Sequence, residues 1–129
     1  MPTVGSTSTT SWPIMMDVIG SQFNQTGGTI VIKREGGTGG QDLGFNTSGC
    51  VISSVTGGVL QIGDATTPAA QIMNIRTFAP VGNLLINSAN ATARLINDPI
   101  RVIQNITLAA GTFNANNQNV RLNGHYSGC

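Results

Sequence analysis

The amino-acid sequence predicts an all-β fold, on three observations. Short runs rich in Val, Ile and Leu recur along the chain, and several of them alternate apolar with polar residues. Gly, Asn, Asp and Pro separate these runs, which is the punctuation expected between strands. The one candidate helix, residues 13–20, is too short to be stable on its own.

The first three expected strands lie at residues 29–33, 49–55 and 58–63, with the sequences TIVIK, GCVISSV and GVLQIG. Val and Ile dominate them, and β-branched side chains suit the pleated surface of a strand. Between the first two lies GGTGGQDLG (36–44), which we interpret as a mobile loop. It lacks the Lys-Ser or Lys-Thr pair and the following helix that a phosphate-binding loop requires.

Three further strands are expected at residues 71–75, 83–87 and 93–97, with the sequences QIMNI, NLLIN and ARLIN. In each, aliphatic residues share the run with Gln, Asn or Arg, as in strands with one buried face. The segments GDATTP, APVG and NDP separate or end these strands, because Gly and Pro interrupt regular structure.

The last two strands are expected at residues 100–108 and 119–124. The stretch NITLAAGTFNANNQNVRLNG (105–124) reads as a strand, a break at Ala-Ala-Gly, an Asn-rich corner and a second strand. Its alternation predicts one buried face, and its asparagines predict left-handed turn conformations at the corner. The residues expected on the buried face are Ile106, Leu108, Val120 and Leu122.

Two architectures fit these strands: antiparallel hairpins forming a β-sandwich, or parallel strands stacked as a right-handed parallel β-helix (β-solenoid). The chain has few aromatic residues for a sandwich core, namely Trp12, Tyr126 and four Phe. The dipeptides typical of hairpins, Asn-Gly and Asp-Gly, are nearly absent between the expected strands. We therefore expect the β-solenoid, with the β-sandwich as the alternative.

A chain of 129 residues is long enough for one domain with a core and too short for two. We expect a flexible linker at residues 1–11, which are rich in Thr and Ser, and a single all-β domain at 12–129. That domain is a candidate fragment of, or subunit in, a longer assembly.

Only 9% of the residues are charged, the net charge is +1, and the six Lys and Arg residues are scattered. We therefore expect no nucleic-acid partner. No apolar run approaches the roughly 18 residues of a membrane helix, so no membrane insertion is expected. The N-terminus lacks the pattern of a signal peptide. A secreted protein with this sequence has either lost its signal or uses another export route.

Residues 105–124 carry a resemblance to a known family. They are similar to a motif in Bacteroidota-type secreted β-helical adhesins, the hemagglutinin-like surface repeat proteins. The matching residues are Asn105, Thr107, Leu108, Gly111, Thr112, Phe113, Asn114, Asn116, Asn119, Val120, Leu122 and Gly124. The resemblance implies a parallel β-helical segment of an exported, extracellular or cell-surface protein.

From this resemblance and the composition we expect a non-enzymatic structural or adhesive segment of a bacterial surface protein or filament. Its expected partners are other copies or neighbouring repeats of the same protein, and surface glycans are candidate ligands. The alternative is a phage tailspike-like β-helix that binds or cleaves carbohydrate. Such an enzyme needs an acidic cleft, and the chain has five carboxylates with no two close in sequence.

Two groups of residues are candidates for covalent or assembly contacts. Cys50 and Cys129 either form one disulfide in an oxidising compartment or remain two thiols. The apolar segment behind the linker is a candidate for strand donation to a neighbouring subunit. Its residues are Trp12, Pro13, Ile14, Met15, Met16, Val18 and Ile19.

No cofactor, metal or catalytic residue is predicted. In a β-helix the charged residues Asp64, Arg76, Arg94, Asp98 and Arg101 could converge from adjacent coils, or they are solvated charges at corners. His125 has no carboxylate neighbour in sequence and is interpreted as an exposed loop residue.

Overall fold

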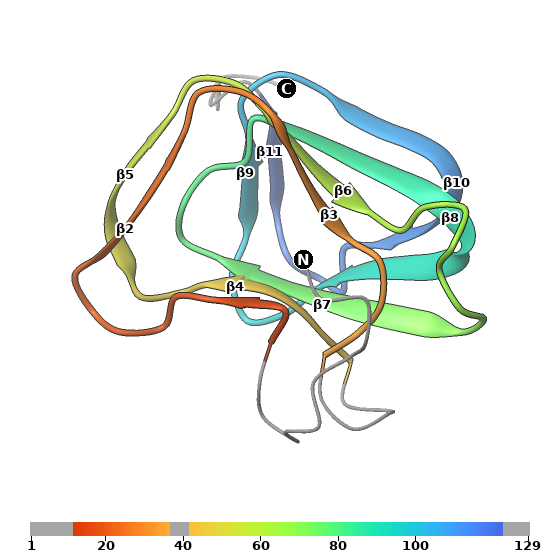
Figure 1. The fold of residues 1–129 in the computed structure, drawn as a ribbon. Coiled ribbons are helices and arrows are strands. Elements are labelled where there is room, and N and C mark those ends of the chain that lie inside the picture. Colours follow the sequence, from red (N-terminus) through yellow and green to blue (C-terminus); the bar gives the residue numbers. More distant parts are fainter. Residues whose placement is uncertain (1–11, 37–41, 123–129) are drawn as a thin grey trace.

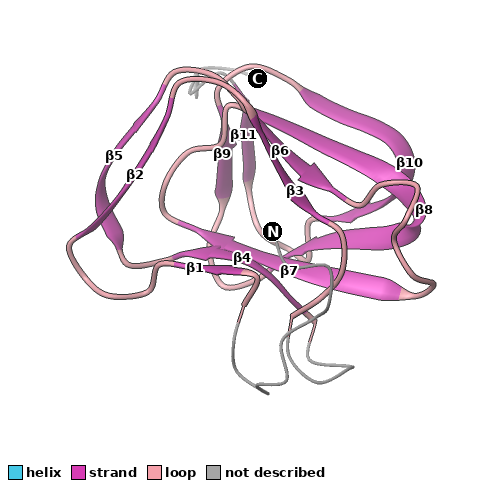
Figure 2. Ribbon diagram, viewed as in Figure 1, coloured by secondary structure: helices cyan, strands magenta, loops and turns pink. Residues whose placement is uncertain are grey.

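The computed structural model describes residues 12–36 and 42–122, and this part of the chain consists of strands and turns with no helix (Figure 2). The all-β prediction is confirmed. The strands are β1 (Ile14–Met15), β2 (Ser21–Gln25), β3 (Thr29–Ile32), β4 (Leu43–Thr47), β5 (Cys50–Val55), β6 (Val59–Ile62), β7 (Gln71–Thr77), β8 (Asn83–Leu95), β9 (Ile100–Val102), β10 (Ile106–Asn114) and β11 (Val120–Leu122). The expected linker at 1–11, residues 37–41 of the expected loop, and His125 lie outside the described residues.

Several strand boundaries differ from the sequence prediction. The two strands expected at 83–87 and 93–97 form one strand, β8, which bends at the right of Figure 1. The strand expected at 100–108 is divided between β9 and β10. The expected break at Ala-Ala-Gly lies inside β10, where the register against β8 shifts twice while the strand follows the bend.

Three strands, β1, β2 and β4, were not predicted. The sequences of β2 and β4, SQFNQ and LGFNT, are rich in polar residues and contain no run of Val or Ile. Each nevertheless pairs with a neighbouring strand, β2 with β5 and β4 with β7. Pairing with a neighbouring strand outweighs weak intrinsic propensity, because β-propensity depends strongly on context.

Every pair of described strands is parallel, and the pairs fall along three lines. The first line runs β1, β4, β7, the second half of β8 and the second half of β10. The second runs β3, β6, the first half of β8 and the first half of β10. The third contains β2 with β5, and β9 with β11. Because β8 belongs to two lines, seven strands form one curled sheet (Figure 1).

The chain takes fewer residues between paired positions as it proceeds. Ile30 lies beside Leu60, 30 positions later. Ile100 lies beside Val120, only 20 positions later. The third line is divided at this change: β2–β5 and β9–β11 are separate two-stranded sheets, and Figure 1 draws the first at the left edge and the second nearer the middle.

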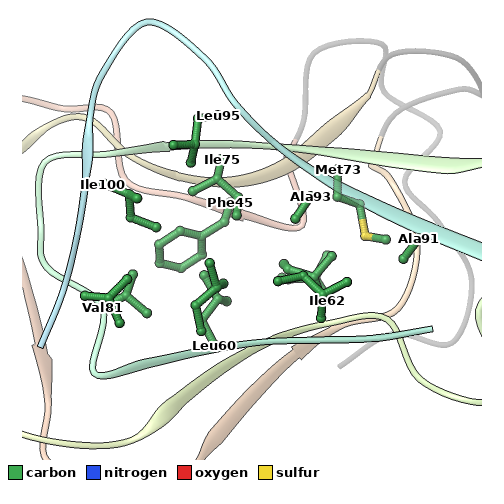
Figure 3. Packing of buried hydrophobic residues seen from close by; sticks show 14 residues of the cluster. Phe45, Leu60, Ile62, Met73, Ile75, Val81, Ala91, Ala93, Leu95 and Ile100 are labelled. Carbon is green, nitrogen blue, oxygen red and sulfur yellow. The ribbon is translucent and has the colours of Figure 1, made fainter. Parts of the chain in front are cut away.

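The core consists of aliphatic ladders, in which one residue from each successive strand occupies the same register position. One ladder contains Ile32, Ile62, Ile86 and Leu108, and another contains Ile14, Phe45, Ile75 and Leu95. Phe45, Leu60 and Ile75 lie together inside the curl of the sheet (Figure 3), and each is at most 1% exposed. Such cross-strand contacts are the main source of sheet stability.

The prediction of one buried face in residues 105–124 was wrong for three of its four residues. Ile106 packs against the core, but Leu108, Val120 and Leu122 are 55%, 39% and 46% exposed. All four continue the inward-facing ladders: Leu108 pairs with Ile86, and Val120 with Ile100. The three residues are exposed because no described strand covers the far side of β10 and β11.

The prediction for the Asn-rich corner is confirmed. Asn116 and Asn117 have φ angles of 50° and 61°, in the left-handed region that Asn tolerates. The Asn116 side-chain amide also donates a hydrogen bond of 3.0 Å to the carbonyl oxygen of Leu95, on the preceding turn of the chain. The corner therefore both turns the chain from β10 towards β11 and attaches it to the preceding turn.

Candidate functional site

A surface pocket of about 490 Å³ lies where the number of residues between paired strand positions becomes smaller along the chain. It is bordered by β5 on one side and by β9 and β11 on the other, with the β7–β8 connection between them. The lining residues are Ser53, Thr77, Phe78, Pro80, Asp98, Pro99, Ile100, Arg101 and Arg121. Its volume is within the range of small-ligand sites.

Two arginines lie side by side along this pocket. Arg101 is the middle residue of β9 and Arg121 the middle residue of β11, and the two are register partners. Paired residues of parallel strands point to the same face, about 4.8 Å apart at the backbone. Ile100 and Val102 point into the core, so Arg101 points outward and is exposed. Arg121 is exposed on the same face and also has an interaction within the chain.

Two further polar side chains of the pocket, Asp98 and Thr77, are already engaged in contacts within the chain. Nε of Arg76 donates a hydrogen bond of 3.0 Å to Oδ2 of Asp98, which neutralises that carboxylate. The Thr77 hydroxyl is buried and donates to the carbonyl oxygen of Ala79 at 2.6 Å. The residue Phe78, in contrast, is 55% exposed. The pocket thus places an exposed aromatic residue beside Arg101 and beside Arg121, which also has an interaction within the chain.

Four of the five charged residues that were predicted either to converge or to be solvated belong to ion pairs, and the fifth, Arg101, does not. Arg76 and Asp98 come together, and Arg101 lines the same pocket. Asp64 instead pairs with Lys33 at 3.1 Å, and Arg94 pairs with Asp42 at 2.9 Å. Convergence is therefore found for three of the five candidates: Arg76, Asp98 and Arg101.

The Asp64 carboxylate is held by hydrogen bonds within a turn. Its Oδ1 accepts hydrogen bonds from the Thr66 hydroxyl at 2.6 Å and from the Thr66 backbone N–H at 2.8 Å. These bonds, together with the Lys33 ammonium, lower the pKa of the Asp64 carboxyl. A carboxylate held in this way closes a turn through hydrogen bonds and is poorly suited to accept a proton in catalysis.

The candidate assembly segment lies at one end of the ladders. Met15, Val18 and Ile19 are 46%, 72% and 87% exposed, whereas Ile14 packs against the core. The other members, Trp12, Pro13 and Met16, are partly buried. β1 pairs only with β4, so its second edge is open among the described strands. Ile14 and Met15 thus already form the first strand of the sheet, and the outer edge of this strand is the part open to a neighbour.

Cys50 begins β5 and is only 4% exposed. Burial raises the pKa of its thiol, because the thiolate loses hydration. Cys129 lies outside the described residues, so the Cys50–Cys129 disulfide stays a prediction.

No protein-family model, curated protein or solved structure matches this chain. Within residues 12–36 and 42–122, no three His, Cys, Asp or Glu side chains gather into a group that could hold a metal ion. The same residues contain no helix of the length and apolarity needed to cross a bilayer.

Sequence reasoning identified Arg101 and Asp98 but missed Phe78 and Arg121. Phe78 follows directly after an expected strand, and an aromatic residue at that position does not by itself indicate a pocket. Arg121 lies 20 positions after Arg101, and each arginine stands between two aliphatic residues: Ile-Arg-Val at Arg101 and Val-Arg-Leu at Arg121. A search for residues repeated at the coil spacing could have paired the two arginines.

Proposed function

We propose that the chain is a non-enzymatic β-solenoid segment of an extracellular, structural or adhesive bacterial surface protein or filament. Its parallel strands and their repeated register support a right-handed solenoid, since parallel crossover connections are almost always right-handed. The low charge and the resemblance of residues 105–124 to secreted adhesins support the extracellular location.

The observation that carries this proposal is the set of incomplete ladders. Leu108, Val120 and Leu122 occupy core positions of the last turn and remain exposed. The backbones of β10 and β11 also pair on one side only among the described strands. An exposed strand edge with apolar side chains at core positions favours the addition of another strand.

The proposed occupant of this surface is a further turn of the same solenoid type, from a second copy or a neighbouring repeat. At the opposite end, β1, β2 and β3 each pair on one side only, with β4, β5 and β6. The edges of β1 and β3 belong to the same two lines of strands as the edge of β10, so a second copy stacked there would continue both lines. Such a contact is head-to-tail and extends a rod, which matches a mechanical role.

The tailspike-like alternative receives less support. It requires carboxylates available for acid–base or nucleophilic work. Asp42, Asp64 and Asp98 are each held by a Lys or Arg side chain at 2.9–3.1 Å.

The test is sedimentation over a range of concentrations together with negative-stain microscopy. We expect the wild-type chain to form linear assemblies that lengthen with concentration. Leu108→Lys should weaken association by about tenfold or more, because stacking would bury an unpaired charge. Thr107→Lys is the matched control: it adds the same charge at the exposed neighbouring position of β10, paired with outward-facing Leu85, and should assemble like the wild type.

A wild-type chain that remains monomeric at every concentration would overturn stacking between copies. Equal assembly of the Leu108→Lys and Thr107→Lys variants would overturn the role of the exposed ladder. Circular dichroism and thermal unfolding of both variants check that they remain folded, which is expected because Leu108 is already 55% exposed.

A further inference from the structure

We propose that the pocket between β5 and β9–β11 binds an acidic polysaccharide, through Arg101 and Arg121 and the ring of Phe78. The inference goes beyond the proposed structural role, and it uses residues other than those of the exposed ladders. The recognised chemistry is a pyranose chain that carries carboxylate or sulfate groups.

The charge of the pocket points to an anion. Asp98 is neutralised by Arg76, and the ion pairs among the described residues do not include Arg101. The pocket lining contains two arginines and one carboxylate. Guanidinium groups bind carboxylates and sulfates through paired, charge-assisted hydrogen bonds.

The spacing of the arginines points to a repeating ligand. Arg101 and Arg121 are register partners on adjacent strands, so their backbones are about 4.8 Å apart. One pyranose unit is close to this length. A charged polysaccharide lying along the direction from β9 to β11 can therefore present anionic groups to both arginines.

The exposed aromatic ring adds an apolar contact. Phe78 lines the same pocket and is 55% exposed, although most large apolar side chains of the described residues are at least partly buried. A pyranose ring has an apolar face of C–H groups that can lie on an aromatic ring. The combination of an aromatic surface with a few oriented polar groups is typical of specific ligand pockets.

Nucleic acid fits these observations less well. A phosphate backbone is usually held by several Lys and Arg residues, and the whole chain carries only six with a net charge of +1. An exposed aromatic residue can also stack on an unpaired base, so single-stranded DNA must be one arm of the test.

The experiment measures binding of the full chain to matched probes by isothermal titration calorimetry at two salt concentrations. The probes are alginate, dextran sulfate, uncharged dextran and an oligothymidine of similar length. We expect binding of alginate or dextran sulfate, weaker at high salt, and at least tenfold weaker binding of dextran and of the oligothymidine. Alginate and dextran sulfate distinguish carboxylate from sulfate as the preferred group.

Arg101→Gln and Arg121→Gln should each weaken binding of the preferred polysaccharide by about tenfold. Phe78→Ala should weaken it by a smaller factor. Arg34→Gln is the matched control, because it removes the same charge from an exposed position that does not line the pocket. Its affinity should stay within about twofold of the wild type, the change expected from net charge alone.

Three results would overturn the proposal: equal effects of the Arg101→Gln and Arg34→Gln variants, binding of uncharged dextran equal to that of the preferred acidic polysaccharide, or preferred binding of the oligothymidine. The Leu108→Lys variant separates this proposal from stacking. It should lose assembly and keep the polysaccharide affinity of a single chain.

Discussion

Gly111 lies where β10 bends to follow β8. Its φ angle is +98°, a conformation that L-residues with a side chain rarely adopt. A Cβ atom at this position would lie 2.3 Å from the carbonyl oxygen of Ser88 and 2.5 Å from that of Ala91. The backbone of one turn thus approaches the backbone of the preceding turn so closely that only glycine fits.

Gly111→Ala should therefore destabilise the chain by about 1–3 kcal/mol, through the positive φ and the forced separation of two backbones. Gly27→Ala is the control, since a Cβ there meets nothing within 4 Å and its φ is not in the positive region. Equilibrium denaturation in urea measures both. A Gly111→Ala variant as stable as Gly27→Ala would contradict the close approach.

Within the strands, an aliphatic side chain contributes more to stability in the middle of a ladder than at its end. Ile62 and Ile86 are fully buried between neighbours on both sides. Leu108 continues the same ladder with a neighbour on one side only. The free energy of burial follows the area removed from water, so the terminal member contributes less within a single chain.

Ile86→Ala should cost about 2–5 kcal/mol of unfolding free energy, because it leaves a cavity in the core. Leu108→Ala should cost less than about 1 kcal/mol in the monomer, since 55% of that residue is already in solvent. Urea unfolding at low protein concentration gives both values. Equal losses would contradict the different burial of the two residues.

Hydrophobic patterning predicted the strands that contain runs of Val, Ile and Leu, and it could not predict those held mainly by their neighbours. TIVIK at 29–33 became β3 almost unchanged, whereas the polar SQFNQ of β2 gave no signal of its own. The alternation around Leu108 correctly gave its inward direction. Its exposure depends on whether another strand follows in space, which no local pattern contains.

The pocket is formed by segments from several parts of the chain that are distant in sequence. It forms because the third line of strands is divided where the coil spacing shortens, which places β5 apart from β9. Sequence reasoning named Arg101 and Asp98 as possible partners from adjacent coils and found no reason to add Phe78. Pocket shape follows from the relative positions of segments that are distant in sequence, whereas periodicity reports only on segments that are close.

A disulfide between Cys50 and Cys129 would also act on the whole molecule, joining β5 to the last residue of the sequence. If it forms, alkylation in denaturant without reductant adds nothing to the intact mass, and alkylation after reduction adds two groups. The bond should stabilise the fold by about 2–4 kcal/mol. One or two added groups without reductant would exclude the disulfide. In that case native Cys50 should react slowly, because burial shields it and raises the pKa of its thiol.

The uniformly parallel strand pairing has a consequence for the size of any assembly. The edge of β1–β3 and the edge of β10–β11 are different surfaces, so a contact between them joins unlike faces and lacks two-fold symmetry. A two-fold dimer is complete after two copies, whereas a straight head-to-tail contact leaves the same pair of ends open after every addition. The geometry of this contact therefore does not limit the number of subunits in the rod. Its final length must be set by the supply of chains, by a terminating partner, or by the number of repeats encoded in one polypeptide.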